Sequence, residues 1–312
     1  MTAQPSPPLP VPRGWFRVGF ADDSPPGTVR PLRYFGRDLV LVVTESGTPR
    51  LFDAFCPHLG AHLGHWGQVE GETLRCPFHG WRFDVDGRCQ EIPYASRIPP
   101  RASLRAWPTV ARNGIVFAWH GPDGSKPDYE IPEVPEVGSP DWTRFVHRRW
   151  TVRSRCQEIA ENTADPAHFG VVHGMQRLTP ELSFDGPRFR SFSSYEASRR
   201  SGETLDSTLE VTWHGLGLGV TRVTGLLELL FLGTLTPIDG EEVEVDFSFS
   251  VCSARGLSTD SGAGKASIDE SVRQMEQDIP IWESKRYLEQ PLLCDGDGPI
   301  GRFRSWSAQF HA

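Results

Sequence analysis

Lysine and methionine are scarce in this chain of 312 residues, and long hydrophobic runs are absent. The chain has three lysines, so arginine supplies nearly all of the positive charge. In total, 32 Lys and Arg residues stand against 40 Asp and Glu residues, which gives a formal net charge of −8. This acidic balance argues against a nucleic-acid partner. No apolar run approaches the roughly 20 residues that a membrane-spanning helix needs.

The N-terminal segment 1–12 is rich in proline and has no apolar signal core. We expect it to be disordered, because prolines without periodicity rarely pack. The chain is therefore predicted to be a soluble, cytoplasmic protein without a membrane segment. Cysteine is limited to six residues, two of which belong to the motifs described next. The other four are predicted to be free thiols in a reducing compartment: Cys89, Cys156, Cys252 and Cys294.

Two short motifs dominate the first third of the chain. Cys56 and His58 form a Cys-x-His motif, and Cys76 and His79 form a Cys-x-x-His motif seventeen residues further on. Two such loops facing each other give a Cys2His2 set, which suits zinc or a two-iron cluster with mixed ligands. A zinc finger usually keeps its cysteines together and its histidines together. Here each loop is mixed, so each loop can give one ligand to each iron.

The order of the elements predicts two domains. Residues 13–122 contain short strand-like runs separated by turns, which indicate an all-β domain. A proline-rich and acidic stretch, 123–140, looks like a connector. Residues 141–312 combine strand-like runs within 189–252 with helical patterns. The clearest of these are 156–165, a long pattern over 266–290 that is interrupted by Pro280, and an aromatic one at 301–310.

An apolar run from Leu216 to Leu235 lies within the second domain. It includes a continuous strand-like stretch from Val220 to Leu232. We interpret the run mainly as buried strand, and the alternative is that part of it lines an apolar pocket.

A second group of metal-binding residue types begins the second domain: Asn162, Asp165, His168 and His173. Two histidines and one carboxylate around Fe(II) form the facial triad of non-haem oxygenases. Residues five apart on a regular helix diverge by about 140°. The two histidines therefore need a local distortion to meet, and Pro166 is the candidate for causing it.

The stretch from Glu158 to His173 resembles the iron-binding helix of Rieske non-haem iron oxygenases, and the two Cys/His motifs resemble the Rieske [2Fe–2S] site. The resemblance implies that Cys56, His58, Cys76 and His79 hold the cluster. It also implies that His168 and His173 bind iron and that Asn162 lies near it. Asp165 is implied to bridge to a cluster-ligand histidine, His79 or His58, of the neighbouring subunit.

The same resemblance places the third iron ligand on the long helical pattern near the C-terminus. Asp278 is the best candidate, in the sequence Glu-Gln-Asp-Ile-Pro-Ile-Trp at 276–282. Three other acids on the same pattern remain as rivals: Asp269, Glu270 and Glu276.

The nearest subgroup is the one that contains the oxygenase component of 3-ketosteroid 9α-hydroxylase and the Rieske cholesterol 7-desaturases. The residues that carry this likeness are 161–169, 281–285, 290–293 and 303–306. The chain looks shorter than those enzymes between the two iron-binding helices, and we expect it to lack the N-terminal membrane segment of the animal desaturases. The implied fold class is α+β. An all-β Rieske domain precedes a catalytic domain of antiparallel sheet covered by helices, in a helix-grip-like arrangement.

The resemblance implies a terminal oxygenase component that uses O₂ and electrons from NAD(P)H, delivered by a ferredoxin or a ferredoxin reductase. It implies a homotrimer and hydroxylation of an apolar alicyclic or polycyclic, steroid-like substrate. Desaturation and O- or N-demethylation on the same iron site stay open. So do two readings of other classes, a Rieske-type electron carrier and a zinc-stabilised binding module. An excess of arginine over acid between residues 82 and 112 suggests either a docking face for an acidic ferredoxin or an ordinary solvated surface.

Overall fold

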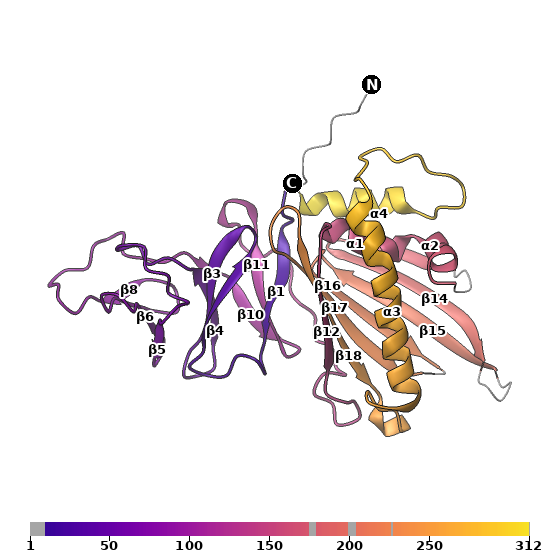
Figure 1. Cartoon of the computed structure of the whole chain (residues 1–312), viewed down its shortest axis with the longest axis horizontal. Coiled ribbons are helices and arrows are strands. Elements are labelled where there is room, and N and C mark those ends of the chain that lie inside the picture. Colours follow the sequence, from indigo (N-terminus) through magenta and orange to yellow (C-terminus); the bar gives the residue numbers. More distant parts are fainter. Residues whose placement is uncertain (1–9, 175–178, 199–203, 226, 312) are drawn as a thin grey trace. The chain divides into compact units, whose positions relative to one another are not determined.

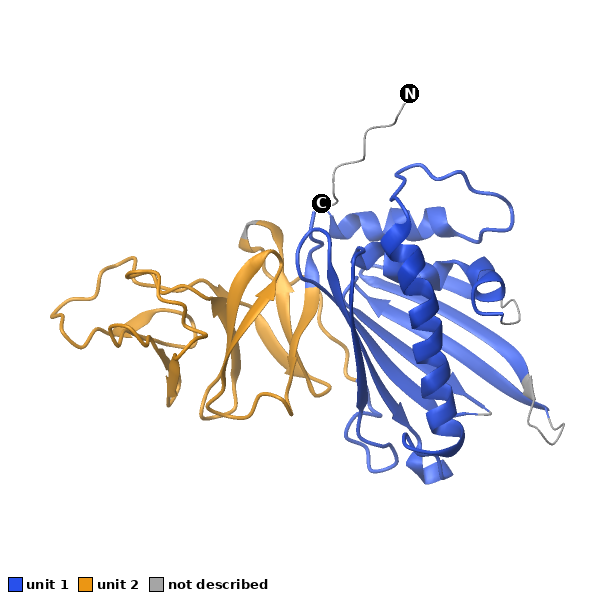
Figure 2. Cartoon of the chain, in the orientation of Figure 1, with its two compact units in different colours: residues 1–14, 134–312 blue, residues 15–133 orange. Residues whose placement is uncertain are grey.

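The computed structural model describes residues 10–174, 179–198, 204–225 and 227–311. The chain forms two compact units (Figure 2). The small unit spans residues 15–133, and the large unit combines 10–14 with 134–311. Residues 1–9 of the segment expected to be disordered lie outside the described residues, whereas Pro10 offers its carbonyl oxygen to Nδ1 of His311 at 3.0 Å.

The small unit is built from strands alone, apart from one 3-10 turn at Pro122–Gly124. One antiparallel sheet has the order β2-β3-β4-β9, a second has the order β1-β11-β10, and a third has the order β5-β6-β7-β8. The strands are β1 Gly14–Phe20, β2 Val29–Tyr34, β3 Arg37–Val43, β4 Pro49–Asp53, β5 Gln68–Glu70, β6 Thr73–Arg75, β7 Arg82–Phe83, β8 Cys89–Glu91, β9 Ala106–Trp107, β10 Thr109–Arg112 and β11 Ile115–His120.

The third sheet carries the two Cys/His loops. Its strands are only two or three residues long, so backbone pairing alone gives it little stability. A buried cluster supplies the rest, in which Leu74 and Phe83 pack with Trp81 and with the two motif cysteines, Cys56 and Cys76. The loops are therefore fixed by a small core of their own.

The large unit is organised on one seven-stranded antiparallel sheet with the order β12-β18-β17-β16-β15-β14-β13. Alternate side chains of a strand point to opposite faces, so each strand presents one row to the helices and one row to the other face. The strands are β12 Val146–Val152, β13 Glu181–Asp185, β14 Arg188–Ser198, β15 Thr204–His214, β16 Leu218–Thr224, β17 Leu229–Pro237 and β18 Val243–Val251.

Helices cover one face of this sheet, and the predicted α+β fold is confirmed. The long helix α3, Gly262–Ser284, runs across the strands, and α1, α2 and α4 lie near one end of it (Figure 1). The remaining helices are α1 Cys156–Glu161, α2 Pro166–Val171 and α4 Ile300–Ser307, with 3-10 turns at Asn162–Ala164, Ser253–Arg255 and Ala308–Phe310. Within the described residues, no helix is long and apolar enough to cross a membrane.

Two expectations about element limits were wrong. The run from Val220 to Leu232 is not one strand, because β16 ends at Thr224 and Gly225 turns the chain with φ +99°. A Cβ at Gly225 would lie 2.3 Å from the carbonyl oxygen of Asp206, so a side chain does not fit there. Pro280 does not interrupt the long helix, since α3 continues to Ser284. Pro280 lies in the last turns and is exposed, where the loss of one backbone hydrogen bond is tolerated.

Candidate metal centres

The two Cys/His loops of the small unit share one backbone design. In the first loop the N–H of Gly60 donates to the carbonyl oxygen of Cys56 at 3.0 Å, and in the second the N–H of Gly80 donates to that of Cys76 at 3.1 Å. Gly60 and Gly80 have φ values of +74° and +72°, a conformation that glycine adopts without strain. Each loop therefore turns back on itself immediately after its histidine.

The four donors of these loops face one another. The cysteines Cys56 and Cys76 are buried, and their thiols are close enough to hydrogen-bond. The rings of His58 and His79 lie 4.6 Å apart, and the Nδ1 atom of each is buried without a hydrogen-bond partner in the described part of the chain. Buried imidazole nitrogens are rarely left unpaired. Two such nitrogens beside two thiols fit a [2Fe–2S] cluster with two cysteine and two histidine ligands.

Ring packing, rather than hydrogen bonding, orients the first of these histidines. His58 stacks on Trp81 with ring centroids 4.7 Å apart and planes inclined by 11°. The indole N–H of Trp81 in turn donates to the hydroxyl of Tyr94 at 2.9 Å. Burial raises the pKa of the Cys56 thiol to about 12. The thiol is therefore neutral until a metal takes the place of its proton.

In the large unit, two histidines meet at the end of a short helix. The helical pattern expected over 156–165 is split, because α1 ends at Glu161 and Asp165 leaves helical geometry with φ −110° and ψ 88°. Pro166 then starts α2, and its ring suits that first position. His168 lies on α2 and His173 follows its end. The break expected at Pro166 is present but precedes both histidines, so Pro166 does not bring them together. They meet because α2 ends at Val171, before His173.

Asp165 caps the helix that carries His168. One of its carboxylate oxygens, Oδ1, accepts hydrogen bonds from the backbone N–H groups of Ala167 at 3.0 Å and His168 at 3.3 Å. This capping role was missed in the sequence, although Asp before Pro is a common helix start. Asp165 therefore fixes the direction of α2 as well as carrying a charge beside His168.

His168, His173 and Asp278 converge into one donor set. Their ligand atoms all lie within 4.8 Å of one another, and Nε2 of His173 is 3.4 Å from Oδ2 of Asp278. The Nδ1 atoms are already engaged: that of His168 with the carbonyl oxygen of Asp165, and that of His173 with Oε1 of Gln277 at 3.0 Å. An imidazole whose Nδ1–H is bound in this way presents Nε2 to a metal. The donor set fits the facial arrangement of a non-haem iron site.

Asp278 is held by a chain of two hydrogen bonds. Nδ2 of Asn162 donates to Oδ2 of Asp278 at 3.0 Å, and Nε1 of Trp282 donates to Oδ1 of Asn162 at 3.4 Å. Because the indole can only donate, it fixes which end of the Asn162 amide faces the carboxylate. Sequence reasoning placed Asn162 near the site but missed Gln277 and Trp282, whose contacts join residues more than 100 positions apart.

Among the described residues, the rival acids do not belong to this set, although Glu270 lines the same cavity. Asp269 is exposed and paired with Lys265, Glu270 is paired with Arg273 at 2.6 Å, and Glu276 is exposed on α3. Asp278 is buried, and burial raises the pKa of its carboxyl group and lowers that of the His168 imidazole. Both shifts favour uncharged side chains, as expected for donors that await a cation.

A cavity of about 330 Å³ opens beside the three donors. Its walls are formed by α1, α2, α3 and the facing rows of β14 to β18. Most of the lining residues are apolar, and β17 contributes Leu229, Phe231 and Leu235. Leu230 and Leu232 of the same strand point to the other face of the sheet, where they are buried. The apolar run is thus both buried strand and pocket wall. A cavity of this size, with a mostly apolar lining and a metal-binding set in its wall, is suited to a small organic ligand.

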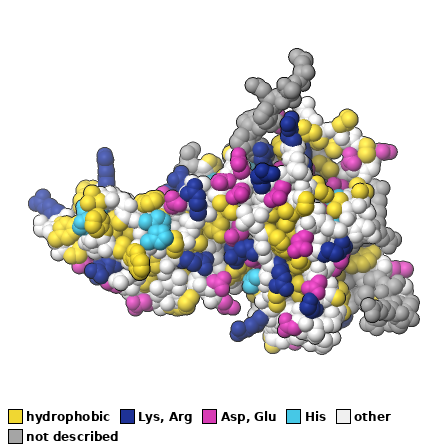
Figure 3. Space-filling model, viewed as in Figure 1, with side chains coloured by type: hydrophobic (Ala, Val, Ile, Leu, Met, Phe, Trp, Pro, Cys, Tyr) yellow, Lys and Arg dark blue, Asp and Glu magenta, His cyan; other side chains and the backbone are white. Residues whose placement is uncertain are grey.

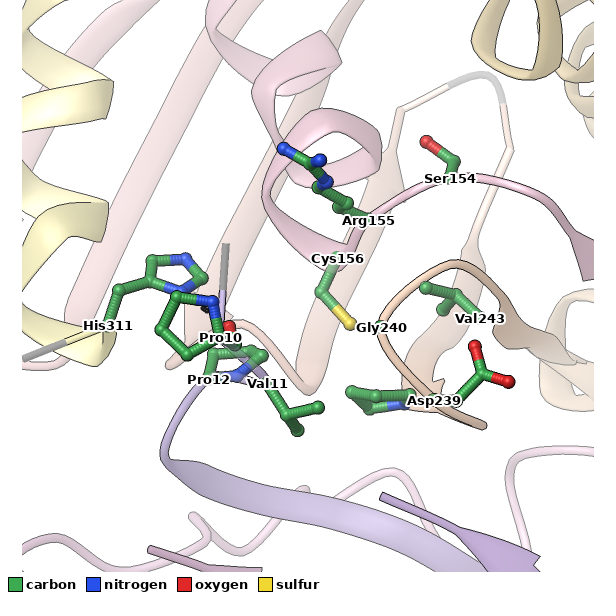
Figure 4. A pocket seen from close by; sticks show the side chains of 11 residues that line it. Pro10, Val11, Pro12, Ser154, Arg155, Cys156, Asp239, Gly240, Val243 and His311 are labelled. Carbon is green, nitrogen blue, oxygen red and sulfur yellow. Dashed lines mark hydrogen bonds between the residues drawn. The ribbon is translucent and has the colours of Figure 1, made fainter. Parts of the chain in front are cut away.

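A second hollow is far smaller. It lies where the segment at Pro10 and Val11 meets His311 and the start of α1 (Figure 4). It encloses about 20 Å³, which is room for about one water molecule. Cys156 reaches it but lies with no set of metal-binding side chains. This hollow is not a substrate site.

Two family models together match almost the whole chain. Residues 14–108 match the Rieske [2Fe-2S] domain, and residues 118–311 match the 3-ketosteroid 9alpha-hydroxylase C-terminal domain. The chain is 34% identical, over 98% of its length and 81% of the relative's, to a probable 3-ketosteroid-9-alpha-monooxygenase, oxygenase component, of Rhodococcus rhodochrous. It is 28% identical, over 96% of its length and 68% of the relative's, to cholesterol 7-desaturase nvd 1 of Ciona intestinalis.

Solved structures share the fold. Dicamba monooxygenase bound to dicamba superposes with a TM-score of 0.72 at 18% identity, covering 96% of each chain. NdmA of Pseudomonas putida with theobromine gives a TM-score of 0.76 at 19% identity, over 95% of this chain and 90% of that one. A Cys2His2 cluster site, followed by a sheet-and-helix unit with a His2Asp set, defines a Rieske non-haem iron oxygenase. The chain belongs to the Rieske oxygenase family with the 3-ketosteroid 9α-hydroxylase type of C-terminal domain.

Proposed function

We propose that this chain is the terminal monooxygenase component that hydroxylates a steroid-like substrate. One observation carries the proposal: the His168, His173 and Asp278 set forms part of the wall of a mostly apolar cavity of about 330 Å³. An apolar polycyclic molecule would fill such a cavity and expel its water. The relatives named as 3-ketosteroid-9-alpha-monooxygenases support the steroid class.

The residues divide the chemistry between them. We propose that the [2Fe–2S] cluster is held by Cys56, His58, Cys76 and His79. The iron is held by a second set, His168, His173 and Asp278, with Asn162 beside it. When bound, the cluster carries single electrons and the iron activates O₂. The cavity walls orient the ligand so that one C–H bond faces the donors, and the apolar lining keeps bulk water away.

Electrons are proposed to originate from NAD(P)H and to arrive through a ferredoxin or a ferredoxin reductase. Of the six arginines in the 82–112 stretch, four are exposed: Arg88, Arg97, Arg101 and Arg105. Arg82 binds Glu91 at 2.9 Å, and Arg112 binds the carbonyl oxygen of Ile131. The exposed ones could steer an acidic donor by long-range attraction. A reduction rate that is independent of ionic strength would exclude this steering.

We further propose a homotrimer in which Asp165 meets His79 or His58 of the next subunit. The second carboxylate oxygen of Asp165 takes no part in the helix cap. Each unit also exposes large apolar side chains, for example Val171 at 87% and Phe78 at 63%. Figure 3 shows histidine side chains at the surface of the small unit with hydrophobic ones around them. Exposed apolar groups of this kind are typical of contact surfaces. The domain limits at 13–122, 123–140 and 141–312, and a cytoplasmic location, also remain predictions.

The bridging role of Asp165 needs a variant that spares the cap. Asp165→Ala removes both the charge and the α2 cap, whose loss costs about 1 kcal/mol and shifts His168. Asp165→Asn keeps a good capping residue and removes only the charge. We expect Asp165→Asn to retain the cluster and the iron. Electron transfer from the cluster to the iron of the next subunit, measured by single-turnover kinetics, should be lost, and substrate turnover with it. Normal turnover in this variant would exclude the bridge.

The substrate proposal is tested with a panel. The purified protein, a ferredoxin–reductase pair and NADH are incubated with 3-ketosteroids, sterols, terpenoids and small aromatics, and products are measured by mass spectrometry. We expect a gain of one oxygen on a steroid, and none with Asp278→Ala. Loss of two hydrogens would assign a desaturase. Conversion of small aromatics but of no steroid would overturn the steroid class.

A further inference from the structure

Two sides of the large cavity carry polar side chains. Helix α3 contributes Ser267, Glu270, Ser271 and Gln274, of which Glu270 is paired with Arg273. Strand β14 directs three hydroxyl side chains into the cavity, and they alternate along the strand: Ser191, Ser193 and Tyr195. We refer to these three residues as the β14 hydroxyl row. The neighbouring strand β15 faces the cavity with Leu209 and Val211, which pair with Ser193 and Ser191 in register. The cavity is therefore polar along β14 and along part of α3, and apolar along β15.

The hydroxyl row lacks protein partners. Within the described ranges, the hydroxyls of Ser191, Ser193 and Tyr195 take part in no hydrogen bond, although Ser191 is only 8% exposed and Ser193 5%. Other hydroxyls of the same cavity are engaged: that of Thr163 accepts from Trp213 at 2.9 Å, and that of Ser271 donates to the backbone at 3.0 Å.

The three oxygens of the β14 hydroxyl row are not among the enclosed side-chain atoms without a partner, so they are accessible from the cavity and can bond to a ligand there. Thr221 of β16, which also faces the cavity without a partner, lies in the same cross-strand row as Ser191. Its methyl group can face the ligand instead. The β14 hydroxyl row is thus a line of three hydroxyls that a ligand in the cavity can reach.

The row also runs away from the metal donors. Trp213, one step beyond Val211 on the cavity face of β15, bonds to Thr163, which is adjacent to Asn162 and so marks the metal end. From Ser191 to Tyr195 the strand advances about 13 Å in the opposite direction. Ser271 lies about 10 Å along α3 from Asp278 and lines the same far end. Burial raises the pKa of the Tyr195 phenol, so it remains a hydrogen-bond donor at neutral pH.

We propose that the β14 hydroxyl row recognises oxygen substituents of the substrate, and that Tyr195 donates a hydrogen bond to a carbonyl at the end of the ligand far from the metal. The proposal rests on the proposed steroid-like substrate and makes it more specific. The ligand is an elongated ring system with an apolar face and an oxygenated edge. A volume of about 330 Å³ is near the lower limit of ligand pockets, which favours a compact ring nucleus over one with a long alkyl tail.

The test compares two ligands that differ by one oxygen. A 3-ketosteroid, and its analogue with CH₂ in place of the carbonyl, are each bound to the metal-loaded full-length protein and measured by equilibrium dialysis. We expect the ketone to bind about tenfold more tightly, and Tyr195→Phe to abolish this preference while leaving the affinity for the CH₂ analogue unchanged. A second variant, Ser193→Ala, should reduce the affinity only for ligands that carry an oxygen nearer the middle of the ring system.

The matched control is Tyr287→Phe. It removes the hydroxyl that accepts from Gln157 at 3.2 Å, outside the cavity, and it should keep the full preference for the ketone. Visible absorption of the cluster reports that each variant is folded. If both ligands bind the wild type equally, or if Tyr195→Phe keeps the preference, the hydroxyl-row proposal is overturned and the steroid class survives. If neither ligand binds the wild type, the steroid class fails and the recognition proposal fails with it.

Discussion

The two donor sets of this protein use opposite nitrogens of their histidines. In the small unit, Nδ1 of His58 and of His79 is buried without a partner, and the rings are placed by packing against aromatic neighbours. In the large unit, Nδ1 of His168 and of His173 is bound by the protein, so Nε2 is the atom left for a metal. The first site is oriented by shape and the second by hydrogen bonds. Each should therefore respond to a different kind of substitution.

The largest expected effect comes from removing one ligand at each site. Asp278→Ala should abolish iron binding and turnover but leave the cluster spectrum intact, because no cluster ligand lies in the large unit. Cys76→Ser should abolish the cluster and turnover but leave the His2Asp set able to bind iron. Iron and sulfide analysis, together with visible and EPR spectra, separates the two cases.

Glu276→Ala is the control for the first of these variants, since it removes a neighbouring carboxylate that is exposed on the same helix. Glu276→Ala should keep both metals and normal turnover. If it lost iron while Asp278→Ala kept it, the assignment of the carboxylate ligand would be wrong.

Removing the hydrogen bond that orients His173 should have a smaller effect on iron binding. Gln277→Leu leaves the Nδ1–H of His173 without an acceptor. We therefore expect the affinity for iron, measured by competition with a chelator, to fall by about 10- to 100-fold. Gln277→Glu keeps an acceptor and should restore most of the affinity. Equal losses in both variants would indicate that Gln277 acts only through packing. The cluster should be unaffected by either.

The donor set of the small unit, in which ring packing orients His58, is tested at Trp81. Trp81→Phe shortens the ring that stacks on His58 and removes the N–H bonded to Tyr94. We expect the cluster to be held about 0.5–1.5 kcal/mol less tightly, which is read as faster bleaching of its visible absorption. Tyr94→Phe removes only the hydrogen bond to Trp81, and it should accelerate bleaching of the cluster less than Trp81→Phe does. A Trp81→Phe protein as durable as wild type would argue against orientation by stacking.

The smallest effect lies away from both metals, at Glu136. Hydrogen bonds from the Arg222 guanidinium hold the pKa of Glu136 below its ordinary value of 4.5. A lowered carboxyl pKa stabilises the fold above pH 4.5, and this contribution is lost as the pH falls through the lowered pKa. Because the pair is partly exposed, we expect Glu136→Gln to cost at most about 1 kcal/mol at pH 7. Thermal unfolding should show this difference shrinking in acid while metal contents stay equal.

The grouping of Cys56, His58, Cys76 and His79 in the small unit was predictable from the sequence, because these donors are local. Cys56 to His79 spans one stretch of chain, and Gly60 and Gly80 already signal the two turns. The broken helix before His168 was also predictable, since Pro166 is incompatible with a continuous helix. Gln277 and Trp282 were not predictable, as nothing in their local sequence distinguishes them from ordinary residues of α3.

The cavity shows the same limit. An apolar run over 216–235 indicates burial, but which of its residues face a ligand depends on the strand register and on the turn at Gly225. The hydroxyls of β14 look like a polar strand in the sequence. Only the pairing of Ser191 with Val211 and of Ser193 with Leu209 places them beside an apolar wall.

The sequence by itself predicted the class of protein, the four proposed cluster ligands and the two histidines proposed for the iron site, because these features depend on residue type and short spacing. The tertiary structure decided how Asp278 meets His173 across 105 positions of chain, which imidazole nitrogens stay available, and which sides of the cavity are polar. Those outcomes depend on how α3 lies on the sheet and on strand register. Both are set by burial summed over the whole unit rather than by any local pattern.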